Sequence, residues 1–334
     1  ILETVKVIRQ AAERAGAPTG SISCITTPTI EATNTLMRHD ITRLILATGG
    51  AAMVKAAYSS GTPAIGVGAG NGPAYIHHTA NVEQAVKRIL DSKTFDNGTI
   101  CASEQSVIME ARMEPAVKAA LRSQGAYLLD EEETKQLSRF ILRSNGTMNP
   151  AIVGKSVETV AKLAGLTRVP ASARVLVARE TGVGKGHPYS SEKLGLILAC
   201  YVEPDEEAVL RRCVEILEWE GAGHTFAIHT EDEAVAKKFA AVPASRVLVN
   251  TPASLGGIGA TTCLFPALTL GCGAVGGSSS SNNIGPLDLI NIKRVAWGVK
   301  ELEQLRGQAG SASPYTVDDS LLDRLVEQIM GRLK

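Results

Sequence analysis

The sequence lacks an excess of charge of either sign and has no long hydrophobic run. Among its 334 residues, 34 are Lys or Arg and 34 are Asp or Glu, so the formal net charge is zero. This balance gives no reason to expect nucleic acid or a membrane surface as the main partner. The longest apolar runs, such as 194–202, have the length of a strand and are too short to span a bilayer. We therefore expect a soluble cytoplasmic protein of about two domains.

The cysteines and histidines show no regular spacing. The six cysteines form no C-x-x-C pair, which is typical of a protein from a reducing compartment with most thiols buried. A metal site would need clustered ligands, and the six histidines do not supply them in the sequence. We therefore expect no metal.

The first residues of the sequence have the apolar periodicity of a helix. Ile1, Leu2, Val5 and Ile8 follow helical spacing, and no Ser, Thr, Asp or Asn cap precedes them. The pattern predicts that the N-terminus is truncated.

Short apolar runs alternate with amphipathic stretches along most of the chain. This alternation predicts an α/β fold with parallel sheets covered on both faces. The predicted strands are 21–27, 44–48, 64–68, 74–77, 106–109, 151–153, 175–178, 196–202, 225–229 and 247–250. The predicted helices include 30–38, 51–59, 82–92, 115–123, 132–142, 157–164, 205–219 and 231–240. The Gly- and Ser-rich segment 271–285 is predicted to be a loop.

Cys101 is a candidate nucleophile because of its place in the chain. It follows the turn signal Asn97-Gly98 and precedes the predicted strand 106–109, so it lies on a loop that can present it to a cleft. An unperturbed thiol has a pKa of about 8.5, and backbone amides or a helix N-terminus nearby would raise the thiolate fraction. Taken alone, the pattern favours a buried structural cysteine instead.

Two glycine-rich segments precede Cys101. Gly49 and Gly50 lie between a predicted strand and a predicted helix, where a backbone can approach a ligand and a helix N-terminus favours a phosphate. The full G-x-G-x-x-G pattern is missing, so a tight strand-to-helix turn is an equal alternative. The second segment, 66–73, is dense in glycine, which is unusual without a close-packed backbone or cofactor.

Together these stretches resemble the aldehyde dehydrogenase superfamily, and within it the branch that acylates coenzyme A. That branch includes the aldehyde dehydrogenase part of bifunctional alcohol/aldehyde dehydrogenases and the aldehyde dehydrogenases of bacterial microcompartments. The likeness is strongest in Phe95–Ser106 around Cys101 and in Ile45–Asn71, and it extends from residue 1 to about residue 305. Further matches are Ser191–Leu194, Gly223–Thr225, Val249–Gly259 and Leu268–Gly273.

The resemblance implies roles for individual residues. Cys101 would add to the aldehyde carbonyl, and its backbone amide would help to hold the oxyanion. Glu192 would hold the nicotinamide ribose, with an exposed surface glutamate as the alternative. His224 would be either a neighbour of the catalytic site or a structural histidine. The residues implied to bind the dinucleotide are Thr48, Gly49, Gly50, Val67, Gly68, Glu192 and Leu194. The residues implied to line the aldehyde pocket are Phe95, Ile100, Ala102 and Thr251.

One departure from the superfamily pattern bears on the product. Hydrolytic members carry a glutamate that activates water, whereas the matching loop here, Val67–Asn71, has no carboxylate. Without a base, water attacks a thioester poorly, but a thiolate is itself a strong nucleophile. The resemblance thus implies a reversible conversion of a short-chain aldehyde (acetaldehyde or propionaldehyde), coenzyme A and NAD to acyl-CoA and NADH, with NADP not excluded. The alternatives are a hydrolytic enzyme that releases the acid and a non-catalytic assembly fragment.

The resemblance also implies a domain order. Residues 1–95 would form a partial NAD- and CoA-binding domain, and residues 96–275 the catalytic domain. Residues 276–306 would return to the nucleotide domain and contribute to oligomerisation, because Asn291–Val295 resembles the strand that the family exchanges between subunits. We therefore expect a homo-oligomer.

The C-terminal segment is predicted to be a flexible linker, 307–317, followed by an amphipathic helix, 318–334. Its apolar residues recur at i, i+3 and i+4, and a short helix on a linker cannot bury such a stripe alone. The segment resembles the encapsulation peptides that direct enzymes into bacterial microcompartments. The alternative is a helix docked on its own domain or on a sister subunit.

Deletion of residues 307–334 tests the targeting hypothesis. We expect the truncated protein to lose co-purification with microcompartment shells, because the deleted segment is the one that resembles encapsulation peptides. Unchanged co-purification would contradict targeting.

Overall fold

The computed structural model of the chain describes residues 1–143 and 146–308. One compact unit comprises Ile1–Leu289, and a second unit begins at Ile290. The predicted helix 318–334 and most of the predicted linker 307–317 lie outside the described residues. None of the described helices is both long and apolar enough to cross a membrane.

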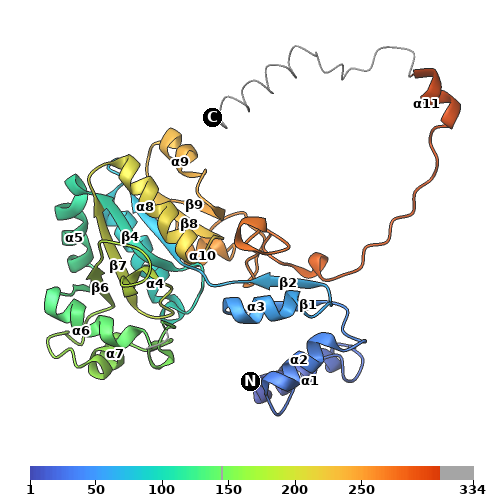
Figure 1. Ribbon diagram of the computed structural model, residues 1–334, viewed down its shortest axis with the longest axis horizontal. Helices are drawn as coiled ribbons and strands as arrows, with labels where there is room; N and C mark the ends of the chain where they lie inside the picture. The colour runs from blue at the N-terminus through green and yellow to red at the C-terminus, as the bar shows by residue number, and fades with distance from the viewer. Residues whose placement is uncertain (144–145, 309–334) are drawn as a thin grey trace. The chain divides into compact units, whose positions relative to one another are not determined.

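Seven parallel strands form the main sheet of the first unit (Figure 1). The strands in sheet order are β5 (Ala126–Leu128), β6 (Val175–Arg179), β7 (Ile197–Glu203), β4 (Glu104–Glu110), β3 (Gly72–Ile76), β8 (Gly223–His229) and β9 (Ala244–Val249). The prediction of an α/β fold with a parallel sheet is confirmed.

Helices cover both faces of this sheet, as its apolar strands require. Successive residues of β4 alternate between the two cores: Ile108 packs into one, whereas Val107 and Met109 pack into the other. The helices that contribute to the Ile108 core are α6 (Glu131–Ile141), α7 (Val157–Ala164), α8 (Glu206–Trp219) and α9 (Glu233–Phe239). Those that contribute to the other core are α4 (Val82–Thr94), α5 (Glu114–Ser123) and α10 (Ala253–Gly257).

Side-chain caps fix where several of these helices begin. Asp130 and Glu133 form a capping box at the start of α6, and Asp205 accepts a hydrogen bond from the Ala208 amide at the start of α8. Asn81 caps α4 in the same way through the amide of Gln84. The start of each of these helices is therefore fixed by a polar side chain at its N-cap.

A second, two-stranded sheet precedes the main one. Its parallel strands are β1 (Ile45–Thr48) and β2 (Ala64–Val67), joined by α3 (Ala51–Tyr58). A small core of Met37, Ala47 and Ala57 holds α2 (Ile30–Arg38) and α3 to this sheet. Helix α1 (Leu2–Arg14) buries none of its residues. The loop after β2 runs directly into β3, so residues 68–71 connect the two sheets.

Two predicted strands are absent from the structure, and two short elements in it were not predicted. Residues 21–27 form no strand, because their side chains are nearly all exposed and no neighbouring strand pairs with them. Residues 150–152 form a 3-10 helix (Pro150–Ile152) and no strand, since Asn149 caps this turn through the amide of Ala151. Strand β5 and helix α10 were not predicted, being only 3 and 5 residues long.

The sheet to which the strand at 74–77 belongs also differs from the prediction. The prediction grouped the strand at 74–77 with the preceding ones, but β3 pairs with β4 and β8 in the main sheet. The domain boundary at residue 95 remains a prediction.

The histidines are also less scattered in space than along the chain. Possible ligand atoms of His77, His78 and Glu110 lie within 4.8 Å of one another. Glu110 reaches the two histidines from the adjacent strand, so the spacing along the chain did not reveal this group; the expectation of no metal remains a prediction.

The second unit contains α11 (Leu302–Gln308). Residues 291–295, which resemble an exchanged strand, form neither helix nor strand in the single chain. A strand of that kind needs hydrogen bonds from another edge, so the exchange and the oligomer remain predictions.

Candidate active site

Cys101 lies at the amino-terminal edge of the main sheet. It precedes β4, whereas Gly70 precedes β3 and His224 lies at the start of β8. Because β8, β3 and β4 are parallel neighbours, their amino-terminal ends meet at this edge. Three of the sequence motifs are thereby brought to one place.

A strained turn presents Cys101. Asp96, Asn97 and Gly98 have φ values of 49°, 51° and 73°. Non-glycine residues in this left-handed region cost roughly 1–3 kcal/mol each and persist only where the surroundings fix them. The hydroxyl of Thr99 donates to the Asp96 carbonyl at 2.9 Å, and a Cβ on Gly98 would lie 2.6 Å from the Gly195 carbonyl oxygen. The turn is thus locked against the loop before β7.

Gly70 packs closely against Cys101. A Cβ on Gly70 would lie 2.0 Å from the carbonyl oxygen of Cys101, so only glycine fits there. The Gly70 amide donates to Glu192 Oε1 at 2.9 Å. Gly70 therefore joins the cysteine loop, the glycine-rich loop and the loop that carries Glu192.

The thiol of Cys101 is protonated at neutral pH in this environment. Burial, and next the charge of Glu192, raise the pKa of Cys101 to about 12, while Arg246 opposes the shift. The backbone hydrogen bond at Cys101 lowers the pKa of the thiol, in the expected direction, but the larger effect of burial outweighs it.

Loop 67–71 has no carboxylate of its own, but Glu192 from another loop places one near Cys101. Burial raises the pKa of Glu192 to about 7, against the opposing hydrogen bond from Gly70. It is half-buried and contacts the glycine-rich loop, so it is not a freely exposed surface residue. Its assignment to the nicotinamide ribose remains a prediction.

Two buried polar side chains hold the Glu192 loop in place. Gln105 Oε1 accepts hydrogen bonds from the Lys193 amide at 2.9 Å and from Lys93 Nζ at 3.2 Å. Lys193 Nζ donates to the carbonyls of Tyr189 and Ser191 at 2.7 and 2.6 Å. These residues were not predicted as site residues, although Lys193 and Gln105 fall inside the motifs around Glu192 and Cys101.

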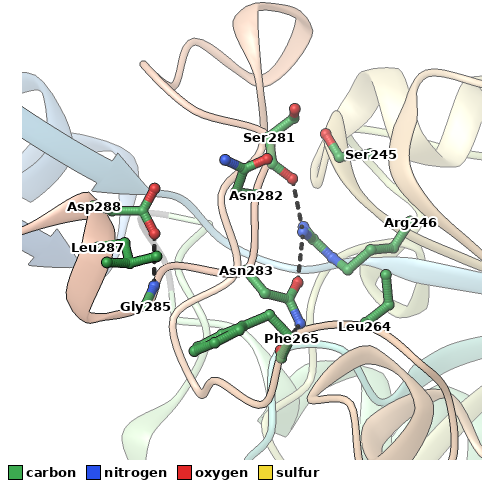
Figure 2. Close-up of a pocket in the computed structure, with 10 residues that line it drawn as sticks. All are labelled: Ser245, Arg246, Leu264, Phe265, Ser281, Asn282, Asn283, Gly285, Leu287 and Asp288. Atoms are coloured by element: carbon green, nitrogen blue, oxygen red, sulfur yellow. Dashed lines mark hydrogen bonds between the residues drawn. The ribbon is translucent and has the colours of Figure 1, made fainter.

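Arg246 on β9 organises the other side of the site. Its guanidinium donates to the carbonyls of Gly271 and His224 at 2.6 and 3.1 Å. Figure 2 shows the same group reaching the Ser281 carbonyl and the Asn283 side chain, beside a cavity of about 540 Å³. Arg246 thereby fixes the loop 271–283 against β8 and β9. A lone arginine in a strand gave no sequence signal for this role.

His224 is fully buried beneath this loop. Its Nδ1 lies 2.8 Å from Thr225 Oγ1, and its Nε2 has no hydrogen-bond partner among the described residues. Burial, helped by the charge of Arg246, lowers the pKa of His224 to about 3. The imidazole is therefore neutral at physiological pH, and a catalytic role for it remains a prediction.

Five of the seven residues predicted to bind the dinucleotide gather where β1 and β2 end. Thr48 pairs with Val67, and the Gly49 amide donates to the Val67 carbonyl at 3.1 Å. Gly50 and Gly68 line a cavity of about 510 Å³. Its other walls include Ala51, Ala69, Ser191, Glu220, Gly221 and Cys272. Leu194 lies elsewhere, with its amide directed at Met148 Sδ.

The residues predicted to line the aldehyde pocket differ in exposure. Phe95 is 41% exposed and Ile100 is half-buried, whereas Ala102 is fully buried. Ala102 packs against α10, where a Cβ on Gly257 would lie 2.9 Å from the Ala102 Cβ. Thr251 is buried with its hydroxyl 2.6 Å from that of Thr261. The pocket itself remains a prediction.

The comparisons with known proteins agree with this geometry. The sequence profile of the aldehyde dehydrogenase family matches residues 3–162. A solved structure described as a probable aldehyde dehydrogenase from Listeria monocytogenes EGD-e is 64% identical, with a TM-score of 0.88; the match covers 92% of this chain and 68% of that one. The chain belongs to the aldehyde dehydrogenase family.

Other aldehyde dehydrogenases are similar over much of the chain. The bifunctional aldehyde-alcohol dehydrogenase AdhE of Escherichia coli K12 is 45% identical over 296 residues, which is 87% of this chain and 33% of AdhE. The chain thus spans about a third of the length of that relative. A propionaldehyde dehydrogenase of Rhodopseudomonas palustris, solved with bound CoA and an acylated cysteine, is 29% identical with a TM-score of 0.73; the match covers 80% of this chain and 60% of that one.

Substitution of Gly70 tests the central contact of this aldehyde dehydrogenase site. We expect Gly70→Ala to lower the free energy of unfolding by about 1–3 kcal/mol, because the added methyl group overpacks the Cys101 carbonyl. Chemical denaturation would measure the loss. Gly68→Ala is the matched control, since its Cβ would meet no atom within 4 Å. Equal stability of the two variants would contradict the close packing.

Proposed function

We propose that the protein oxidises a short-chain aldehyde and transfers the acyl group to coenzyme A, with NAD as the hydride acceptor and Cys101 as the nucleophile. One observation carries the proposal: three family motifs converge on Cys101 through the Gly70 contact. The acylated cysteine of the R. palustris relative supports a thioester at the corresponding step.

The cysteine performs the covalent step of the proposed reaction. The Cys101 thiol loses its proton, and the thiolate adds to the carbonyl carbon to give a hemithioacetal oxyanion. The backbone amide of Cys101 donates to that oxyanion. Loss of a hydride from the hemithioacetal carbon leaves a thioester on Cys101. Coenzyme A then attacks this thioester and regenerates the cysteine, and the exchange of one thioester for another makes the reaction reversible.

The cavity at the ends of β1 and β2 suits a dinucleotide. Its volume of about 510 Å³ lies in the ordinary range for cofactor sites. Gly50 and Gly68 present bare backbone to it, with no atom within 4 Å of a would-be Cβ. The N-terminus of α3 lies beside Gly50 and favours a phosphate group. A dinucleotide bound there supplies the hydride acceptor.

Loop 67–71 supports release by coenzyme A over release by water. Val67, the first residue of this loop, stands where hydrolytic members are expected to have the glutamate, and its side chain is fully buried. An aliphatic side chain cannot act as a general base. Asn71 at the other end of the loop donates its side-chain amide to the Ser190 carbonyl at 2.6 Å. Glu192 is the carboxylate that could replace the missing glutamate, and its Oε1 is engaged by the Gly70 amide.

Assembly and location belong to the same proposal. Exposed apolar side chains of the second unit, including Ile292, Val295 and Trp297, suit a contact with another copy of the chain. The microcompartment hypothesis rests on residues 318–334, outside the described part of the chain.

Replacement of the nucleophile tests the proposed reaction. In the purified protein, we expect Cys101→Ser to lower the rate of thioester synthesis by more than about a thousandfold, because a serine hydroxyl is much less readily ionised than a thiol. Reduction of NAD by the unsubstituted protein should also require coenzyme A. Measuring NADH formation with and without coenzyme A tests both the loss of activity in Cys101→Ser and the need for coenzyme A. Cys263→Ser, which replaces an exposed cysteine, is the control. Free acid formed without coenzyme A would support the hydrolytic alternative.

The charge of Glu192 predicts a pH-dependent effect on Cys101. Glu192→Gln removes a negative charge that raises the pKa of the thiol, so we expect Cys101 to be alkylated several-fold faster in this variant at pH 8–9. The difference should vanish below about pH 7, where Glu192 itself becomes protonated. Peptide mass spectrometry after iodoacetamide treatment measures the rate. Equal rates at pH 8–9 would contradict the coupling, and the remote, exposed Glu132→Gln serves as control.

A further inference from the structure

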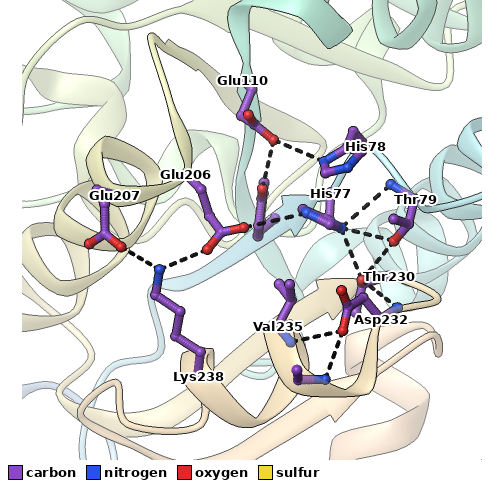
Figure 3. Close-up of polar contacts among 12 residues, drawn as sticks. His77, His78, Thr79, Glu110, Glu206, Glu207, Thr230, Asp232, Val235 and Lys238 are labelled. Atoms are coloured by element: carbon purple, nitrogen blue, oxygen red, sulfur yellow. Dashed lines mark hydrogen bonds and ion pairs between the residues drawn. The ribbon is translucent and has the colours of Figure 1, made fainter.

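A second cluster of chemically active side chains lies at the carboxyl-terminal edge of the main sheet. His77 and His78 follow β3, Glu110 ends β4, and Glu206 is the first residue of α8 (Figure 3). Cys101 lies beyond the opposite end of β4. The 7 residues of that strand, at about 3.3 Å each, separate the cluster from the active site by roughly 20 Å.

The geometry of the cluster suits a metal ion. One ligand atom from each of His77, His78 and Glu110 lies within 4.8 Å of the others. His77 Nε2 is 3.4 Å from Glu206 Oε2, and His78 Nδ1 is 3.6 Å from Glu110 Oε1. His77 is only 1% exposed, yet its Nε2 makes no hydrogen bond to any described residue. A buried imidazole nitrogen thus points at carboxylate oxygens without bonding to them.

The neighbouring side chains fix the orientation that a ligand needs. His77 Nδ1 lies 2.9 Å from Thr79 Oγ1 and 3.1 Å from Thr230 Oγ1, which leaves Nε2 directed at Glu206. The hydroxyl of Tyr75 donates to Glu110 Oε1 at 3.0 Å. Outer hydrogen bonds of this kind orient the ligands in metal sites.

Arg112 already places a positive charge at the cluster. Its guanidinium lies 2.7 Å from His78 Nδ1 and donates to Glu110 Oε2 at 2.8 Å. The atoms it contacts are therefore ones that a cation would use. The Arg112 side chain is 57% exposed, so it can rotate into solvent at little cost. A metal ion must displace it.

We propose that His77, His78 and Glu110 form a zinc site that competes with Arg112, with the neighbouring Glu206 carboxylate as fourth ligand, and that the ion clamps β3, β4 and α8 together. The ligand atoms of the first three residues already lie within 4.8 Å of one another, and Glu206 lies outside this group but 3.4 Å from His77 Nε2. Imidazole nitrogens and carboxylate oxygens are donors that zinc accepts in four-coordinate sites. The distance from Cys101 makes the role structural, so zinc should raise thermal stability and leave the chemistry of the active site unchanged.

Metal titration of the purified full chain, stripped of metal by a chelator, tests this proposal. Zinc binding is followed by calorimetry, and cobalt(II) is used as a probe whose absorption reports tetrahedral coordination. We expect one equivalent to bind and to raise the melting temperature. Since exposed or reactive thiols also bind zinc, the titration is repeated with Cys24, Cys101 and Cys263 all replaced by serine. Loss of binding in that variant would overturn the proposal.

Variants of the cluster complete the test. We expect His78→Ala to weaken zinc binding more than about a hundredfold, beyond the effect of losing an outer hydrogen bond. Because His78 is 41% exposed, its removal should leave the fold intact, which circular dichroism verifies. Arg112→Ala should instead strengthen binding several-fold, and the exposed His39→Ala should change nothing. Unchanged affinity in His78→Ala, or weaker binding in Arg112→Ala, would overturn the proposal.

Discussion

The close approach of Gly70 to the Cys101 carbonyl is the contact on which the rest of the site depends. The loop 68–71 leaves the carboxyl end of β2 and enters β3, so it belongs to both sheets. Ligands of open α/β sheets bind outside the carboxyl ends of strands, where Gly50 and Gly68 border the cavity. The same short loop also touches the cysteine at the amino end of the main sheet. A side chain at Gly70 would separate these two edges.

This packing also has an electrostatic consequence. The cysteine is buried enough that its thiol stays protonated, and the nearby Glu192 opposes its ionisation further. A buried, protonated thiol reacts slowly with oxidants and adventitious electrophiles. Ionisation of the thiol is therefore favoured by any change in the surroundings that lessens its burial or removes the charge of Glu192. The carboxylate near the thiol thus acts as a restraint on ionisation in the free protein.

Sequence reasoning was strongest where side-chain periodicity decided the structure. The strands at 106–109 and 196–202 and the helix at 205–219 were predicted because their apolar residues are buried in regular patterns. It failed at 151–153, where the Asn149 cap outweighed an apolar run. Cys101 and the glycine loops were found from motifs, whereas Arg246 and Gln105 were not. Their roles depend on contacts with residues 12 to 88 positions away, such as Gly271 and Lys193, which no local pattern encodes.

The two ends of β4 illustrate how one strand can serve separate purposes. Its amino end follows Cys101, the proposed nucleophile, and its carboxyl end supplies Glu110 to the histidine cluster. Both cores of the main sheet pack against the strand, with Ile108 in one and Val107 in the other. The strand is therefore packed on both faces along its whole length. A cross-link of β3, β4 and α8 at the carboxyl edge would oppose separation of β3 from β4. Gly70 lies just before β3 and Cys101 just before β4. A constraint that keeps these two strands together at the far edge should therefore also stabilise the contact between Gly70 and Cys101.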